Sequence, residues 1–267
     1  MPSKPRGRIA VACLLASSLP ALAAGAGDLP EVEKAGRLRA LVVEGSPAFY
    51  SLAQGGEPGL DREVLEGFAS LRRLKLETVP VGSWAELLPA LLEGRGDLIA
   101  GGVTVTPARR EKIDFSAEVM PTRHVAVNRR PAPPIGSLAQ LKALRVGTVR
   151  GSSMAEVLTA VGVKGFDETV PSGGAPEALR SGRIAATVSG IEDALLYRRE
   201  DPAIQIGMFV GPAGSLAFGV RKDAPQLRRA LDEYVGNLRR TPTWSRLVVK
   251  YFGEVAPELL KKARSEE

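Results

Sequence analysis

The stretch that decides the fold runs from Trp84 to Ser116 and reads WAELLPALLEGRGDLIAGGVTVTPARREKIDFS. Its leucines recur at helical spacing until Gly94 ends the pattern, and the short apolar segment Leu98 to Ala100 then predicts a buried strand. A Thr-Pro pair at 106–107 predicts the start of a second helix, because proline is favoured at the first helical position. Helix, buried strand and helix in this order indicate an α/β fold.

Several groups in this stretch converge just after the buried strand. They are the backbone turn at Gly101 and Gly102, the hydroxyl of Thr104 and the guanidinium of Arg109. Arginine presents a planar fork of donors that matches the two oxygens of a carboxylate. The stretch therefore predicts a binding pocket for a carboxylate, and it contains no obvious nucleophile.

The N-terminus has the pattern of a secretory signal peptide. Basic residues at positions 4, 6 and 8 precede an apolar run from Ile9 to Leu22, and the small residues of ALAAGAGD follow. This pattern predicts a signal peptide over residues 1–24 and not a membrane span, because the apolar run is too short to cross a bilayer. The only cysteine, Cys13, lies inside the apolar run and not at its end, which disfavours a lipid anchor. We therefore expect an exported chain.

Composition and charge exclude several classes of function. After cleavage about 240 residues remain, enough for two lobes, and the formal net charge falls from +6 to +3. Basic residues occur in no block longer than a pair, which argues against nucleic-acid and membrane-surface binding. With one histidine and no cysteine left, we expect no metal, no cofactor and no catalytic residue. No second apolar run is long enough to span a membrane, so we expect a soluble protein.

Strand and helix patterns alternate along the chain, and part of the pattern occurs twice. We expect strands at 38–43, 76–81, 98–100, 124–128 and 215–220, and helices at 60–71, 84–94, 225–240 and 243–251. LRALVVEGS at 38–46 resembles LRVGTVRGS at 144–152, and ALLEGRGDLIAGG at 90–102 resembles ALRSGRIAATVSG at 178–190. The proline-rich RRPAPP between the copies reads as a boundary. This predicts two related halves with mostly parallel sheets.

The predicted architecture is two α/β lobes joined by two hinge strands, with a cleft between them. Residues 28–127 and 219–255 are expected to form lobe I, and residues 128–218 are expected to form lobe II. Residues 256–267 are expected to form a C-terminal tail.

Two motifs connect this architecture to a known family. They are W-x-x-L-L-P-A-L-x-x-G-x-x-D, which begins at Trp84, and T-x-T-P-x-R-R-x-K-x-D-F-S, which begins at Thr104. Over about Gly36 to Gly253 the chain resembles the family 3 bacterial extracellular solute-binding proteins, the periplasmic receptors of polar amino-acid ABC transporters. The resemblance implies a type II-like periplasmic-binding-protein fold that closes on its ligand.

The resemblance also implies roles for individual residues. Arg109 is expected to pair with the ligand carboxylate, with Thr104 and the backbone of Gly102 beside it, and Trp84 is expected to pack against the ligand side chain. From the other lobe, Ser152 and Ser153 are expected to donate to the same carboxylate at a helix N-terminus, where an anion is favoured.

The sequence departs from the family pattern at the ligand ammonium. The family places an aspartate at the end of the second-lobe strand, and Gly190 stands there in this chain. Glu192 or Glu44 is a candidate substitute, because a cation in a dry cleft needs a carboxylate partner. Without the aspartate, the expected ligand shifts toward an atypical amino acid, a peptide-like compound or an organic acid. We expect His124 to be structural and Asp193 to lie on a helix surface.

The sequence therefore predicts a monomeric periplasmic receptor that captures a small carboxylate-bearing ligand, an amino acid or related compound, and delivers it to an ABC permease. One alternative is a sensing module like those of receptor kinases and membrane-bound lytic transglycosylases. A second is an enzyme similar to cyclohexadienyl dehydratases, in which Glu44, Glu118 or Glu192 would be the general acid.

Overall fold

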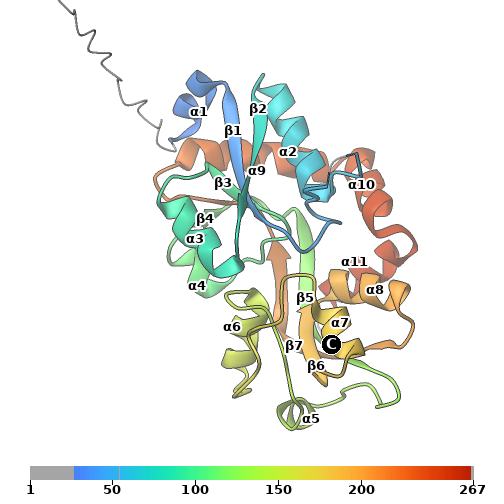
Figure 1. Cartoon of the computed structure of the whole chain (residues 1–267). Coiled ribbons are helices and arrows are strands. Elements are labelled where there is room, and N and C mark those ends of the chain that lie inside the picture. Colours follow the sequence, from blue (N-terminus) through green and yellow to red (C-terminus); the bar gives the residue numbers. More distant parts are fainter. Residues whose placement is uncertain (1–26, 54, 266–267) are drawn as a thin grey trace, which may run out of the picture.

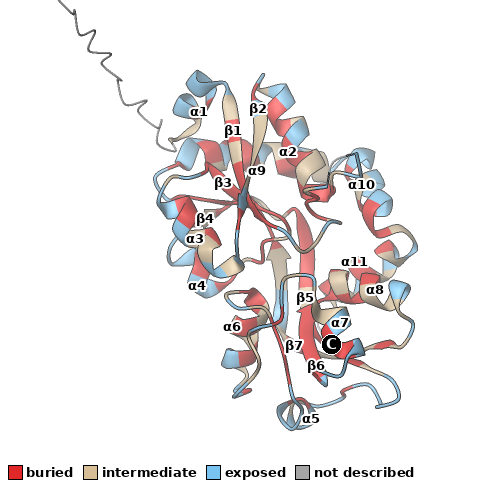
Figure 2. Cartoon of the chain, viewed as in Figure 1, coloured by how far each residue is buried: buried red, intermediate tan, exposed pale blue. Residues whose placement is uncertain are grey.

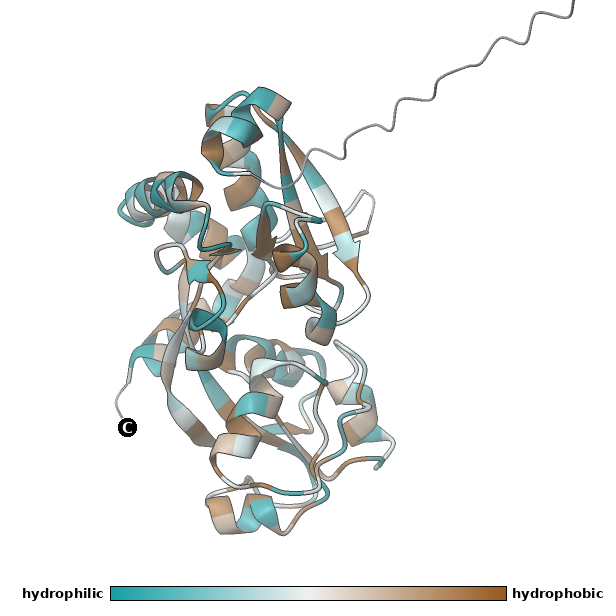
Figure 3. Ribbon diagram, turned by 90° about the vertical axis from the view of Figure 1, so that its left-hand side faces the viewer, coloured by the Kyte–Doolittle hydropathy of each residue, from teal (hydrophilic) through white to brown (hydrophobic). Residues whose placement is uncertain are grey.

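The structure of the protein is a computed structural model that describes residues 27–53 and 55–265. The predicted signal peptide, residues 1–24, lies outside the described residues. The described chain forms two α/β lobes, each built around its own β-sheet (Figure 1). A view from the side shows one lobe above the other (Figure 3). The predicted fold class, two lobes with hinge segments between them, is confirmed.

Lobe I is built on a five-stranded sheet. In sheet order its strands are β2 (Lys75–Val81), β1 (Arg37–Val43), β3 (Leu98–Ala100), β8 (Gly219–Val220) and β4 (Asp114–Phe115). Its helices are α1 (Leu29–Ala35), α2 (Leu60–Leu71), α3 (Trp84–Leu92), α4 (Pro107–Arg110), α9 (Pro225–Arg239) and α10 (Pro242–Phe252). Strand β1 pairs in parallel with β2 and β3, whereas β8 is antiparallel to β3 and β4. Alternate residues of β1 face two separate cores, which buries the strand on both sides.

Lobe II is built on a three-stranded antiparallel sheet. In sheet order its strands are β6 (Ala186–Gly190), β5 (Met120–Arg129) and β7 (Ile204–Leu216). Its helices are α5 (Leu138–Lys142), α6 (Ser153–Ala160), α7 (Ala175–Arg180), α8 (Ile191–Glu200) and α11 (Ala256–Arg264), and the short 3-10 helix η1 (Gly253–Val255) leads into α11. The sheet is strongly buried along β5 and β6 (Figure 2).

The expectation of mostly parallel sheets is wrong for lobe II. Strand β5 brings the chain into this lobe and β7 takes it back, so the two run in opposite directions and pair along most of their length. The segment that begins at residue 144 forms only isolated bridges: two are parallel, Val146 to Ala186 and Gly147 to Asp167, and one is antiparallel, Val149 to Thr169. The second copy of the repeat therefore keeps the apolar pattern of the first without forming an equivalent strand.

The chain passes between the lobes along two segments that lie side by side. The backbone N–H of Ser116 donates to the carbonyl of Phe218, and that of Val119 donates to the carbonyl of Leu216, both at 2.8 Å. From Met120 onward β5 belongs to the lobe II sheet, so residues 120–127, which the sequence assigned to lobe I, pair within lobe II. The expected single strand at 215–220 is divided between β7 and β8.

The last residues form a helix, where the sequence analysis expected a tail. Helix α11 buries Ala256, Leu259 and Ala263, and it contacts β5, β7 and α8 of lobe II. The preceding helix α10 packs on α2 and α9 of lobe I. The short link η1 is therefore a third place where the chain connects the two lobes (Figure 1).

Local sequence signals explain the helix next to the cavity described below. Ser83 caps α3 by accepting a hydrogen bond from the backbone N–H of Glu86 at 3.3 Å. The Glu86 carboxylate accepts from the backbone N–H of Gly82 at 3.3 Å, one residue before the position a capping box requires. In α2, Leu60, Val64 and Phe68 are buried as their spacing predicts, but Leu71 is 72% exposed.

Among the described residues, no helix is long and apolar enough to cross a bilayer.

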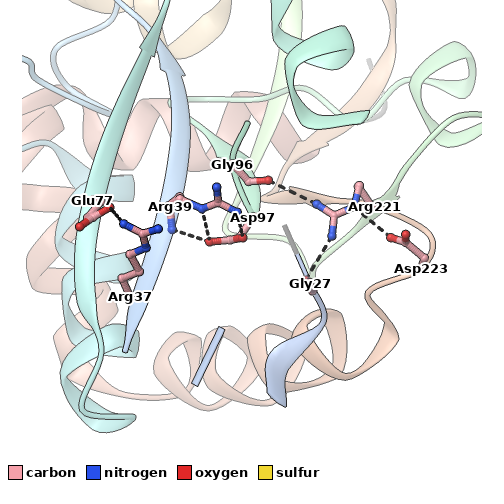
Figure 4. A network of polar contacts seen from close by, with 8 residues as sticks. All are labelled: Gly27, Arg37, Arg39, Glu77, Gly96, Asp97, Arg221 and Asp223. Atoms are coloured by element: carbon pink, nitrogen blue, oxygen red, sulfur yellow. Dashed lines mark hydrogen bonds and ion pairs between the residues drawn. The ribbon is translucent and has the colours of Figure 1, made fainter. Parts of the chain in front are cut away.

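A buried ion pair ties β1 to the start of β3 (Figure 4). The Asp97 carboxylate accepts two hydrogen bonds from Arg39, one from the backbone N–H at 2.8 Å and one from the guanidinium Nη2 at 2.9 Å. Nearby, Arg221 pairs with Asp223 and reaches the carbonyls of Gly96 and Gly27. The Asp97 side chain is 3% exposed and that of Asp223 is 77% exposed.

We expect Asp97→Ala to lower the free energy of unfolding by about 3 kcal/mol, because the Arg39 guanidinium and amide would lose their buried partner. Denaturant unfolding of the ligand-free protein measures this change. The matched control is Asp223→Ala, which removes a carboxylate that is 77% exposed. Its partner Arg221 is buried but keeps the carbonyls of Gly96 and Gly27, so the loss is expected to cost about 1 kcal/mol or less. Equal losses in the two variants would show that burial is not the cause.

Candidate functional site

A cavity with a volume of about 40 Å³ lies between the lobes. Residues from both lobes line it: Ser46, Phe49, Trp84, Gly101, Gly102, Thr104 and Arg109 from lobe I, and His124, Ser152, Ser153, Met154, Gly190, Glu192 and Asp193 from lobe II. Of the residues that the sequence analysis proposed for ligand binding, Glu44 does not border this cavity; those that do are Arg109, Thr104, Gly102, Trp84, Ser152, Ser153 and Glu192. Their individual contacts differ, and these contacts decide which side chains are able to meet a ligand.

Arg109 is buried and touches both lobes. Thr106 caps the short helix α4 and places Arg109 in its first turn. Its Nη1 donates to the carbonyl of Thr104 at 3.0 Å, its Nη2 donates to the carbonyl of Gly151 at 3.3 Å, and its Nε lies 3.2 Å from a carboxylate oxygen of Glu156. Burial lowers the pKa of Arg109 and Glu156 opposes that shift. The group stays cationic, because arginine is not deprotonated in proteins, and so this side of the cavity holds a positive charge.

A chain of hydrogen bonds joins the lobes beside Arg109. Ser153 Oγ donates to Thr104 Oγ1 at 3.0 Å, and His124 Nε2 lies 3.0 Å from Ser153 Oγ. Burial, with a smaller contribution from the Arg109 charge, lowers the pKa of His124 to about 4. The imidazole is therefore neutral at neutral pH, and the tautomer of His124 decides which of the two groups donates in the contact with Ser153. His124 takes part in the site, whereas the sequence analysis assigned it a structural role.

Two of the expected ligand donors are used within the protein. The backbone N–H groups of Gly101 and Gly102 both donate to the buried carboxylate of Asp61 at 2.9 Å. Ser152 caps α6 by accepting from the N–H of Ala155, and its own proton goes to the carbonyl of Val149 at 2.6 Å. Gly102 and Ser152 therefore shape the cavity while these donors are paired within the protein, and their expected contact with a ligand stays a prediction.

Trp84 also spans the two lobes. It is the first residue of α3, and its indole Nε1 donates to Ser172 Oγ of lobe II at 3.3 Å. Its ring centroid lies 5.9 Å from the guanidinium carbon of Arg109, close enough for a cation–π attraction. The ring is thus held beside the expected carboxylate anchor, as an aromatic wall of the cavity.

A neighbouring carboxyl lies in the space beside Gly190. A Cβ atom placed on Gly190 would lie 2.0 Å from Oε1 of Glu192, so the Glu192 carboxyl fills the space that a side chain at position 190 would need. The other oxygen of Glu192 accepts a hydrogen bond from Thr122 Oγ1 at 2.7 Å. Burial, and to a smaller extent the neighbouring Asp193, raises the pKa of Glu192 well above its ordinary value.

Asp193 is a second acid at the same end of α8, and the sequence analysis placed it on a helix surface. Its carboxylate accepts from Ser46 Oγ of lobe I at 2.8 Å, and burial raises its pKa. The usable signal was the acidic pair that directly follows β6 at the helix start. The other candidate, Glu44, is exposed and does not line the cavity.

The comparisons with known proteins agree with this architecture. The model of the bacterial extracellular solute-binding proteins, family 3, matches residues 38–254, and the chain belongs to this family. The family gives the chain a solute-binding role, the coarser part of the predicted function.

Three relatives illustrate the range of that family. The membrane-bound lytic murein transglycosylase F of Alteromonas mediterranea is 27% identical over 82% of this chain, which spans about half the length of that relative. A solved solute receptor for L-cysteine of Neisseria gonorrhoeae has a TM-score of 0.77 at 23% identity, over 87% of this chain and 96% of the other. An ancestral arginine-binding protein bound to glutamine has a TM-score of 0.70 at 28% identity, over 82% and 99%.

Proposed function

We propose that this protein is a hinged receptor for a small α-amino acid and that it delivers this ligand to an ABC permease. The observation that carries the proposal is the charge arrangement in one buried cavity. Arg109 supplies a cation, and Glu192 and Asp193 supply two carboxyl groups. Among the described residues, Arg109 pairs with Glu156 and with neither of these acids. A zwitterion would match both kinds of group, with its carboxylate at Arg109 and its ammonium at the acids.

The geometry at Gly190 supports an amino acid over a simple organic acid. An acid is present in the space next to position 190, and it comes from Glu192, two residues later. A ligand without an ammonium group would leave both acids of α8 without a cationic partner. This favours an ordinary α-amino acid, where the sequence alone shifted the expectation toward atypical compounds and organic acids.

Close contacts between the lobes support a hinged mechanism. A Cβ on Gly151 would lie 2.6 Å from the backbone of Ala85, and one on Gly45 would lie 1.8 Å from Ser172 Oγ. The lobes therefore meet through glycines, and a ligand enclosed between them has to enter through an opened form. Because a ligand that contacts both lobes binds the closed form better, it shifts the population toward closure.

A sensing module is the second candidate. The transglycosylase relatives contain a unit similar to this chain, and they are about twice as long as the part that matches it. In both roles the ligand chemistry is the same and the partner differs. Deleting the gene abolishes uptake of the ligand if the protein serves a permease. Normal uptake combined with an altered cell-wall phenotype would favour the sensing role.

The proposal predicts that both charged groups of the ligand are required. Calorimetry of the exported chain with the amino acids that raise its melting temperature most measures the affinity. The deaminated acid and the carboxamide of the same ligand are each expected to bind about 100-fold more weakly. The first lacks the cation that would face Glu192 and Asp193, and the second lacks the carboxylate that would face Arg109. Equal affinity for the deaminated acid would reject the roles of Glu192 and Asp193.

A further inference from the structure

A second cavity, with a volume of about 50 Å³, adjoins the first. The two share Ser46, Trp84, Met154 and Asp193 as lining residues. A ligand group held between Arg109 and the α8 acids would therefore have this second space beside it. Its wall continues into lobe II along β6 and along the segment that contains Thr148.

Thr148 in this wall has an unused hydrogen-bonding group. The residue is 2% exposed, and its backbone N–H donates to the carbonyl of Asp167 at 2.8 Å. Its hydroxyl oxygen is buried and has no hydrogen-bond partner among the described residues. Buried hydroxyl groups are normally paired, because an unpaired one loses its hydration without compensation. A ligand group that reaches Thr148 would supply the missing partner.

The lining of the second cavity selects against charged ligand side chains. It includes aliphatic side chains such as Val149, Val170 and Val188, and neither lysine nor arginine belongs to it. Asp193 is the only carboxylate in the lining, and Ser46 already donates to it. An acidic side chain would meet Asp193 with no cation beside it. A cationic side chain would compete with the ligand ammonium for the same carboxylate.

We propose that the second cavity holds the side chain of the ligand and selects a neutral side chain that ends in an amide or a hydroxyl, with Thr148 as its hydrogen-bond partner. This inference rests on the proposed amino-acid function, and it names the class of substrate. Aliphatic walls accommodate the carbon chain, and one hydroxyl that can both donate and accept suits an amide or an alcohol equally.

The test uses ligand pairs that differ by a single polar group. Calorimetry compares L-threonine with L-valine, and L-glutamine with L-methionine and L-glutamate, on the wild type and on Thr148→Val. We expect at least one polar neutral ligand to bind about tenfold more tightly than its apolar partner to the wild type, and Thr148→Val to remove most of that difference while apolar ligands bind as before. The melting temperature of ligand-free Thr148→Val is expected to be equal or higher, because the variant removes an unpaired buried hydroxyl and keeps the shape.

Two outcomes overturn this inference and leave the amino-acid function intact. One is tightest binding by an apolar or acidic member of the panel, and the other is an unchanged preference in Thr148→Val. Failure of the proposed function has a different result, in which no amino acid raises the melting temperature or Arg109→Gln binds the panel as the wild type does. A fall in the melting temperature of ligand-free Thr148→Val would also count against the inference, because it would show that the hydroxyl has a partner within the protein.

Discussion

Arg109→Gln is expected to weaken amino-acid binding by about 2 kcal/mol or more, since a hydrogen-bonded charge partner of the ligand carboxylate would be lost. All three guanidinium nitrogens already face protein groups, at Thr104, Gly151 and Glu156, which fixes the orientation of the group. Glutamine keeps an amide but has neither the positive charge nor the planar fork. The measurement is calorimetric titration with the amino acid that stabilises the wild type most.

Two control variants separate the anchor role from simpler explanations. Arg110, the next residue, is exposed and lies over the ring of Phe115, so Arg110→Gln removes the same charge without touching the cavity. We expect its affinity to stay within about twofold of the wild type. Glu156→Gln removes the carboxylate that faces Arg109, and we expect equal or tighter binding because Glu156 competes with the ligand for Arg109. If Arg109→Gln and Arg110→Gln had equal affinities, Arg109 would not be the anchor.

The second large effect is a dependence of stability and binding on pH that originates at Glu192. Burial and the neighbouring Asp193 raise its pKa to about 8 from an ordinary 4.5. At pH values between these two pKa values, Glu192 holds a proton in the folded protein and has lost it in the unfolded chain. The free energy of unfolding therefore falls as the pH rises through this range. Below about pH 4 both states are protonated and this contribution is constant.

Glu192→Gln is expected to flatten this dependence between pH 6 and pH 8 by up to about 2 kcal/mol, because glutamine resembles the protonated acid and does not titrate. Thr122 is able to donate to the glutamine oxygen as it does to Glu192. Urea unfolding of the ligand-free wild type and variant at several pH values measures the two slopes. Asp193 contributes with the same sign at lower pH, where its own raised pKa lies at about 6, so the comparison is made above that value. Identical slopes would show that another group titrates.

The same carboxyl couples ligand binding to protons. A ligand ammonium favours the charged form of Glu192, so binding at neutral pH is expected to release a proton. Calorimetry in buffers with different enthalpies of ionisation detects this release as a difference in the apparent binding enthalpy. The difference should vanish in Glu192→Gln, and its persistence there would assign the proton to a different group.

The sequence was sufficient for the features that depend on local pattern. The apolar spacing located β1, β2, α2 and α3, and the Thr-Pro pair located α4 with Arg109 in its first turn. The two motifs led to the correct family, because a family pattern summarises many such local constraints at once. The sequence also showed that Gly190 stands where the family has an aspartate. It named Glu192 as one of two candidates to replace that aspartate.

Features that depend on distant contacts were not predictable. The Gly101 and Gly102 amides are occupied because Asp61, forty residues earlier on α2, points its carboxylate at them. The role of Asp193 depends on Ser46 of the other lobe. Whether a side chain or an amide is free to meet a ligand depends on which groups the tertiary fold has already paired with it, and spacing along the chain does not contain that information.

The helix α11 changes how the two lobes are able to separate. The two adjacent segments between the lobes would by themselves form a simple hinge. The link η1 adds a third connection, because it joins α10 on lobe I to α11 on lobe II. Three chain connections that do not lie on one axis restrict the rotation of one lobe against the other, unless one of the connections changes its conformation. Any rotation of one lobe against the other would bend the backbone near Gly253 or separate α11 from β5. The C-terminal helix therefore adds a constraint on the relative movement of the lobes.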